Sequence, residues 1–340
     1  MSLNASPPAS APRSISPVVF AVAVLVVGGL AVAGTAVYFE LTPKTTAATG
    51  ASVTDDLGHT TTVVTNPHRV AVFGPNIVDS MVRLGLRSDI VGVDCSSAAF
   101  GGLLGDYTPN QTAAWTLTSS LCIQAYPAVS PEALLNKSPQ LILATSIVSQ
   151  SQIESFSVSY HVPVVWLIPT TLGGIVVDLD ILAKLFPAAA AAPTLIGEVQ
   201  RALAQASSFD TNLSNNPNAT YPRVLLTYYV DPAAGYFTYG PGTFGDSLLT
   251  LAGGLNIAAN ASVPFPTLAG STVLAAQPNV VVYGVGPLGE PLSAYAQAPN
   301  WATISATKVP LDVTLFTEAD PTMVLTGLTA LTHALHPQGT

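Results

Sequence analysis

Residues 67–94 read PHRVAVFGPNIVDSMVRLGLRSDIVGVD, and this stretch decides the fold class. Residues 69–73 form a short apolar run rich in β-formers, which is typical of a buried strand. Residues 74–76, Gly-Pro-Asn, predict a tight turn. Apolar residues then recur at helical spacing over residues 77–86, and a second apolar run at residues 90–93 predicts another strand.

This strand–helix–strand pattern is a βαβ unit, so the two strands are expected to be parallel neighbours. Ligands of open parallel sheets bind beyond the carboxyl ends of the strands. We therefore expect Asn76 and Asp94, which follow the two strands, at a ligand-binding site. Asn76 is also a candidate helix N-cap, and Asp79 is expected in the first turn, where its charge would suit the helix dipole.

The composition is poor in charged residues. Of 340 residues, 49% are hydrophobic and 9% are charged, against roughly 25% charged in an average soluble domain. The formal net charge of −9 argues against nucleic acid as a partner. Neutral polar residues are expected to cover the surface, which would suit an acidic medium because carboxylates lose their charge and their ion pairs there.

The apolar patterns predict two α/β lobes. A second βαβ unit over residues 131–167 completes the first lobe, and strand and helix patterns resume at residue 223. The expected fold class is α/β, with two Rossmann-like lobes of parallel-rich sheets joined by a single long backbone helix and preceded by a transmembrane helix. The predicted parts are a disordered cytoplasmic tail (1–16), a transmembrane anchor (17–39), a linker (40–52), an N-terminal lobe (53–168), an inter-lobe helix (169–210) and a C-terminal lobe (211–340).

The N-terminal segment is expected to hold the protein on a membrane. Residues 18–39 carry no charge and are mostly Val, Ala, Leu and Gly, and a helix of that length would span about 33 Å. A signal peptide has a shorter apolar core, so a retained anchor is favoured, although cleavage stays open. Arg13 on the short side predicts a single-pass cell-membrane protein with residues 40–340 extracytoplasmic.

The chain has two cysteines, Cys95 and Cys122, which are too few for a tetrahedral zinc site. They could be two buried thiols. A disulfide is the favoured interpretation, because the compartment is expected to be oxidising and the segment between them is a long irregular loop. Closing that loop would contribute roughly 3–4 kcal/mol in the chain-entropy model.

No catalytic motif is found, since the chain lacks a Gly-x-Ser-x-Gly elbow, a Walker loop, HExxH and GxGxxG. The histidines are scattered. His333 and His336 could share a helix face, but Pro337 follows at once, so a frayed helix end is favoured over a metal site. We therefore predict a protein that is not an enzyme and has no cofactor and no metal site.

Aromatic residues near predicted strand ends indicate a binding cleft. Large flat ligands are held well by aromatic walls with a few polar groups. The alternative is that these residues are ordinary core aromatics. The candidates are Tyr107, Trp115, Trp166, Tyr229, Tyr236, Tyr239 and Tyr283. Few basic residues accompany them, which favours a neutral or weakly charged ligand over a multiply negative one.

Five blocks in order resemble one known family. They are the segment TDDLGH followed by PHRV (54–59 and 67–70), SPEALL before QLIL (130–135 and 140–143), GDSLLTLAGGLN (245–256), PNVVV (278–282) and Asn300-Trp301 with Val309. In this order they resemble the substrate-binding proteins of ABC importers for vitamin B12, ferric siderophores and haem. No single block is unique to that family, and the likeness covers most of residues 53–337.

The resemblance implies a protein that captures a cobalamin-like or iron-chelate ligand between its lobes and delivers it to an ABC permease with its ATPase subunits. It places Trp301 at the ligand. It also implies docking on the permease through one glutamate on each lobe, which corresponds to Glu132 here, while Ser271 replaces the second glutamate. The alternatives are a surface-anchored interaction protein on the same scaffold and a metal-ion-binding variant.

Overall fold

The structure is a computed structural model that describes residues 50–94, 97, 121–125, 128–217, 220–286 and 289–337. The predicted tail and transmembrane anchor, residues 1–39, lie outside these ranges and stay predictions. Within the ranges described, no helix is long and apolar enough to cross a bilayer. Residues 46–340 form one compact unit that contains both lobes.

The described chain begins with an antiparallel hairpin, part of which had been predicted as linker. Strand β1 (Gly50–Thr54) pairs along its whole length with β2 (Thr60–Val64). Asp55 in the turn is buried, and its carboxylate accepts a hydrogen bond of 3.1 Å from the backbone nitrogen of Trp166. This bond fastens the hairpin to the sheet behind it, so the first lobe begins at residue 50.

The first lobe contains a five-stranded parallel sheet, and the βαβ patterns predicted four of its strands and their parallel pairing. The fifth strand lies in the segment that was expected to be an irregular loop. Its strands, in spatial order, are β5 (Cys122–Ile123), β4 (Ile90–Asp94), β3 (Val70–Phe73), β6 (Leu141–Ala144) and β7 (Val164–Trp166). The central strands β3 and β6 are buried at every residue. Parallel strands between two layers of helices are apolar throughout for this reason.

Helix α1 (Pro75–Arg83) starts two residues earlier than the periodicity suggested. Gly74 is its N-cap without a side-chain bond, and Pro75 is well suited to the first helical position. Asn76 is thus inside the helix, and its predicted role as N-cap is wrong. The predicted dipole role of Asp79 is also wrong, because Asp79 lies beyond the first turn and pairs with Arg83 at 3.0 Å.

Two helices cover the outer part of the first sheet. α3 (Pro131–Asn136) is capped by Ser130, whose hydroxyl accepts a hydrogen bond of 3.2 Å from the backbone nitrogen of Ala133. α4 (Gln150–Tyr160) buries Ile153 and Phe156 against the sheet. Both helices lie where the sequence predicted them.

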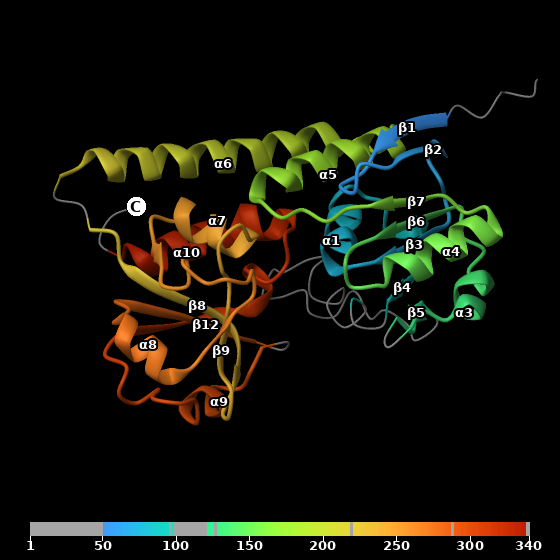
Figure 1. The fold of residues 1–340 in the computed structure, drawn as a ribbon. Coiled ribbons are helices and arrows are strands. Elements are labelled where there is room, and N and C mark those ends of the chain that lie inside the picture. The colour runs from blue at the N-terminus through green and yellow to red at the C-terminus, as the bar shows by residue number, and fades with distance from the viewer. Residues whose placement is uncertain are drawn as a thin grey trace, which may run out of the picture. The chain divides into compact units, whose positions relative to one another are not determined.

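Two helices, rather than the predicted single long one, connect the lobes. They are α5 (Leu172–Leu185) and α6 (Ala192–Asn215). Pro187 lies in the break, because proline cannot continue a helix, whereas Pro193 lies in the first turn of α6, where it is tolerated. Figure 1 shows α5 and α6 side by side, with α6 running along the second lobe, where it contacts α7 (Phe244–Leu251).

The second lobe has a mixed six-stranded sheet. The strands are β8 (Arg223–Asp231), β9 (Gly235–Thr238), β10 (Leu255–Asn256), β11 (Thr267–Leu268), β12 (Val280–Val285) and β13 (Thr307–Asp312). β8, β10, β12 and β13 are parallel, whereas β9 and β11 pair antiparallel. The prediction of parallel-rich sheets is confirmed. It did not include the antiparallel pairing of β9 and β11 at one edge of this sheet.

The helices of the second lobe repeat part of the first lobe's order. They are α7 (Phe244–Leu251), α8 (Gly270–Ala276), α9 (Leu292–Ala296) and α10 (Leu328–Leu335), with short turns η1 (Arg87–Asp89, first lobe), η2 (Val313–Leu315) and the π-helical η3 (Met323–Gly327). α8 precedes β12 as α3 precedes β6, and β12 and β6 each pair with the first strand of their sheet. The two lobes therefore share this supersecondary unit.

The lobes share one hydrophobic core. A single cluster of buried side chains includes Ile77 of α1, Leu182 of α5, Leu226 of β8 and Val324 of η3. Two smaller clusters fill the outer faces of the two sheets. Because packed cores resist deformation, this continuity makes the connection between the lobes stiff.

A buried polar link joins the lobes next to this core. Asp79 of α1 accepts hydrogen bonds of 3.2 and 3.1 Å from the backbone nitrogen and the hydroxyl of Thr322. Arg83 donates to the same hydroxyl at 2.6 Å. Burial raises the pKa of the Asp79 carboxyl, and the Arg83 guanidinium opposes that rise.

Candidate ligand-binding site

A cavity of about 490 Å³, called here the inter-lobe cavity, lies at the carboxyl ends of the first sheet and is closed by loops of the second lobe. On the first-lobe side it is lined by the residues that follow β3, β6 and β7, which are Pro75, Asn76, Thr145, Ser146, Ile147 and residues 167–170. On the second-lobe side it is lined by residues 242–244, Pro264, Phe265, Glu318 and Ala319. This is the place where parallel sheets bind ligands.

A second cavity of about 540 Å³, called here the aromatic cavity, adjoins the first. Its lining has five aromatic rings, which are those of Tyr228, Tyr229, Tyr239, Phe244 and Phe265. The rings of Tyr228 and Tyr239 are 5.0 Å apart between centroids, and those of Tyr239 and Phe244 are 5.3 Å apart. Phe244, Phe265 and Glu318 line both cavities, so the two lie next to each other and share part of their walls.

The block at residues 245–256 holds the wall of the aromatic cavity in place. Asn256 donates hydrogen bonds of 2.8 Å to the carboxylate of Asp246 and to the backbone oxygen of Tyr239. A side-chain carbon on Gly245 would lie 2.2 Å from the Tyr239 ring, so this position requires glycine. The hydroxyl of Tyr239 donates to the backbone oxygen of Phe316 at 2.8 Å, which fixes the ring.

Glu318 is the one acidic or basic residue in the described lining of either cavity. It is partly exposed and follows η2. Removal from water raises the pKa of its carboxyl to about 8, and the negative charge of Asp94 adds to the rise. The Glu318 carboxyl in turn helps to raise the pKa of Tyr239, after burial and Tyr228.

Further carboxyl groups lie below the site. Asp320 is fully buried, and one of its carboxyl oxygens accepts a hydrogen bond of 2.7 Å from the backbone nitrogen of Met323, while the other has no hydrogen-bond partner among the described residues. Burial raises its pKa well above the ordinary value, and Asp79 and Glu318 add to the rise. The cavities are therefore surrounded by carboxyl groups that hold their protons to a higher pH than usual.

The structure brings three of the predicted ligand residues to the site. Asn76 lines the inter-lobe cavity, and Tyr229 and Tyr239 line the aromatic cavity. Tyr229 is 40% exposed, which leaves its ring open to a ligand, whereas Tyr239 is almost fully enclosed.

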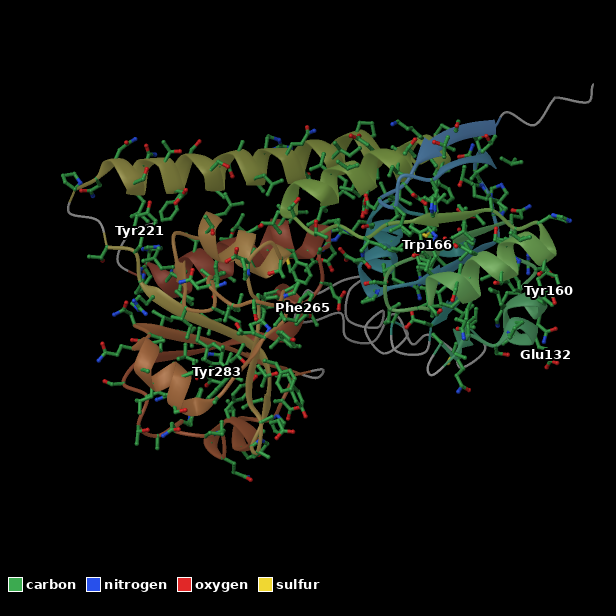
Figure 2. The ribbon with its side chains drawn as sticks, in the orientation of Figure 1. Glu132, Tyr160, Trp166, Tyr221, Phe265 and Tyr283 are labelled. Carbon is green, nitrogen blue, oxygen red and sulfur yellow. The ribbon has the colours of Figure 1, made fainter. Side chains whose placement is uncertain are left out.

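Four other predicted ligand residues lie in the hydrophobic cores of the lobes. This agrees with the alternative interpretation, that such residues are ordinary core aromatics. Trp166 is 1% exposed and packs between β6 and α4 in the first lobe. Tyr236, Tyr283 and Trp301 pack together in the second lobe, where the Tyr236 ring stacks on Trp301 at 6.3 Å and its hydroxyl is bonded to the backbone oxygen of Pro299. Figure 2 shows Tyr283 well apart from Phe265 at the site.

Asp94 has a structural position beneath the site. It is fully buried at the end of β4, and its carboxylate accepts hydrogen bonds of 3.0 Å from the backbone nitrogen of Gly74 and 2.7 Å from that of Ser97. It thus holds the turn that places Asn76. Direct contact between Asp94 and a ligand is not supported by this position.

Several predicted residues fall outside the described ranges. Tyr107, Trp115 and Cys95 are among them, so their predicted roles stay predictions. Cys122 has no free thiol, but its pairing with Cys95 stays a prediction. Within the described ranges, no group of three or more His, Cys, Asp or Glu residues could hold a metal ion.

The two docking positions lie at equivalent places. Glu132 is exposed in the first turn of α3, and Figure 2 shows it on the outside of the first lobe. Ser271 is exposed in the first turn of α8. Because α3 and α8 occupy the same place in the repeated unit, the alignment that paired these residues agrees with the fold.

Sequence reasoning missed several lining residues. Thr145 and Leu167 follow strands β6 and β7, so the rule that identified Asn76 would have found them. Phe244 and Phe265 stand in a helix start and a loop, beside the aromatic residues already noted. Glu318 has no signal in the sequence, because only the packing of η2 places it at the site.

One sequence relative is informative. No family model matches the chain. A cobalamin-binding protein of Halobacterium salinarum is 28% identical to it over 226 residues, which are 66% of this chain. The chain spans 56% of the length of that relative.

Solved structures with a similar fold include periplasmic binding proteins. A periplasmic haem-binding protein from Pseudomonas aeruginosa superposes with a TM-score of 0.65 and 20% identity, covering 81% of this chain and 94% of that one. A molybdate periplasmic binding protein from Haemophilus influenzae superposes with a TM-score of 0.66 and 19% identity, covering 84% and 91%.

The two-lobed α/β fold is the fold of these binding proteins. Within that class, the relatives confirm the resemblance drawn from the sequence, which is to the substrate-binding proteins of ABC transporters. The structures compared bind different ligands by name, haem and molybdate, so the fold alone does not identify a ligand.

Proposed function

We propose that the protein is an extracytoplasmic solute-binding protein that captures a cobalamin-like or iron-chelate ligand and delivers it to an ABC permease. The observation that carries the proposal is the site formed by the adjoining inter-lobe and aromatic cavities. Its flat aromatic walls suit a large planar chelate. The sequence relative, which binds cobalamin by name, favours a corrinoid.

The role requires no chemistry on the ligand. The described lining lacks a nucleophile paired with a base, and its one carboxyl group, that of Glu318, has no such partner. The relatives compared here are binding proteins by name. Binding and release are therefore the whole of the proposed activity.

The membrane arrangement is part of the proposal. We infer that residues 17–39 anchor the chain in the cell membrane and that residues 40–340 are extracytoplasmic. A tether of this kind would keep the site near the permease and its ATPase subunits, which raises the effective concentration of the binding protein there.

Ligand capture is tested with the full chain in detergent. Cyanocobalamin, haemin and ferric chelates are each added in a thermal-unfolding experiment. A ligand at 100 times its Kd should stabilise the fold by about 2.7 kcal/mol, which raises Tm by several degrees. If none of them raises Tm, the proposal is wrong and the surface-anchored interaction protein becomes the better interpretation.

Docking on the permease is tested at Glu132. The change Glu132→Arg should slow uptake in cells that depend on this protein, because it reverses a charge expected to meet permease arginines, and it should leave ligand affinity unchanged. Ser271→Arg is the matched variant on the second lobe. Loss of affinity in Glu132→Arg would contradict the assignment.

A further inference from the structure

The aromatic cavity combines two features that point to the charge of its ligand. Five rings line it, and aromatic faces attract cations through their quadrupoles. Glu318 lies at the junction with the inter-lobe cavity. Rings of this kind together with a carboxylate are how proteins hold quaternary ammonium and similar groups.

The described linings of both cavities contain no Lys, Arg or His. An anionic ligand group would therefore find no counter-ion there, and an ionised Glu318 would repel it. The nearby cation Arg83 is bound to Asp79 and Thr322 and is not among the residues that line either cavity. Charge complementarity thus disfavours carboxylate-bearing or otherwise anionic ligands.

We propose that the aromatic cavity holds a positively charged, apolar-faced group of the ligand against Glu318, and that this residue determines the charge specificity of the site. The chemical class is a cationic metal chelate or an organic ammonium. The inference rests on the proposed function, because it assumes that the transported ligand occupies these two cavities. It adds that the ligand carries a positive charge.

The state of Glu318 makes the proposal measurable. Its carboxyl makes no hydrogen bond or ion pair with another described residue, and its pKa of about 8 leaves it mainly protonated at pH 7. A bound cation favours the ionised carboxylate, so binding should release a proton. Affinity should accordingly rise with pH up to about pH 8, by at most about tenfold per pH unit.

Other charged or ionisable groups lie near Glu318, and their effect on affinity has to be separated from that of Glu318. They are Asp94 at the end of β4, Asp320 after η2, Tyr239 after β9, Tyr228 of β8, and Asp79 with Arg83 of α1. The variant Glu318→Gln keeps the size of the side chain and removes only its titration. Any pH dependence that remains in this variant belongs to the other groups.

The experiment measures Kd by titration calorimetry on the full-length protein at pH 6, 7 and 8. The probes are aquacyanocobinamide, which carries one positive charge, and dicyanocobinamide, its neutral counterpart. A second pair is choline and its uncharged isostere 3,3-dimethylbutan-1-ol. The variants are Glu318→Gln and, as a charge-matched control on the exposed face of α6, Glu198→Gln.

At pH 8 the cationic member of a pair should bind at least tenfold more tightly than the neutral member, and its Kd should fall as pH rises. Glu318→Gln should abolish both effects, whereas Glu198→Gln should leave them unchanged. Corrinoid binding without charge preference or Glu318 dependence would overturn this inference and leave the proposed function intact. Binding of choline without binding of any corrinoid or chelate would overturn the proposed function and leave this inference intact. Absence of binding by every probe would overturn this inference, whereas the proposed function fails only if the chelates of the thermal-unfolding experiment also leave Tm unchanged.

Discussion

At the scale of single residues, the clearest consequence of this fold is the burial of carboxyl groups. Asp178 of α5 is 5% exposed, and its pKa is raised to about 9 by burial first and by the neighbouring Asp56 second. Asp56 also accepts a hydrogen bond from the backbone nitrogen of Ile168, a residue of the inter-lobe cavity. The protonation of Asp178 is thus tied to the segment that lines the site.

We predict that this group makes the fold less stable as pH rises. Its pKa is about 9 in the folded protein and close to the ordinary 3.8 when unfolded, so the folded state holds the extra proton between these values. The free energy of unfolding should fall across this window by up to about 1.4 kcal/mol per pH unit from this group. Asp178→Asn should flatten the dependence.

Urea unfolding at pH 5, 6.5 and 8 measures the effect. Asp180→Asn, two residues further along the same helix and exposed, is the control and should keep the dependence of the parent protein. An unchanged pH dependence in Asp178→Asn would show that the buried carboxyl is not its source. Greater stability at pH 5 would agree with the acidic medium that the composition suggested.

At the scale of secondary-structure elements, the ends of α1 and α7 offer a matched test of packing. Gly85 and Gly253 have φ angles of 78° and 75°, a region that favours glycine. A side-chain carbon on Gly85 would meet open space, whereas one on Gly253 would lie 2.7 Å from the ring of His336 and from Leu213 of α6.

The prediction is that Gly85→Ala costs about 1–2 kcal/mol for the left-handed backbone alone, while Gly253→Ala costs more, by roughly 1–3 kcal/mol for overpacking. Thermal or urea unfolding of the two variants provides the comparison, and each serves as the control for the other. Equal losses would mean that α7, α6 and the C-terminal segment do not pack as tightly as described.

At the scale of the whole molecule, the connection between the lobes limits their motion. The lobes share a hydrophobic cluster, two linking helices and the buried Asp79–Thr322 bonds. Hinges need a few residues free to change backbone angles, and packed elements resist such changes. We therefore expect a small closure on ligand binding rather than a wide opening.

Distances between spin labels at Ser155→Cys in the first lobe and Ala275→Cys in the second measure this closure. Both positions are exposed on helices, α4 and α8. On addition of the chelate that raises Tm, the distance should change by less than about one helical turn, 5.4 Å. A pair within the first lobe, at Thr60→Cys and Ser155→Cys, is the control. A larger change across the lobes would contradict the shared-core interpretation.

The sequence by itself determined the class and order of the elements. The apolar runs that became β3, β4 and β6 and the helical spacing of α1 and α4 were predicted, because periodicity reports which faces of an element are buried. Asn76 was placed at the site because the carboxyl ends of parallel strands lie at one edge of the sheet, where ligands bind. Five sequence blocks in the right order were enough to show a resemblance to the substrate-binding proteins of ABC importers, and the relatives confirm that resemblance.

Only the tertiary structure decided which aromatic residues meet a ligand and which fill a core. Tyr229 and Tyr236 lie on strands that pair with each other, yet one is 40% exposed and the other is fully buried. Composition cannot separate them, because burial depends on what packs against each face. Glu318 belongs to the site for a similar reason: long-range packing brings it beside Asp94, and that proximity and the loss of water change its chemistry.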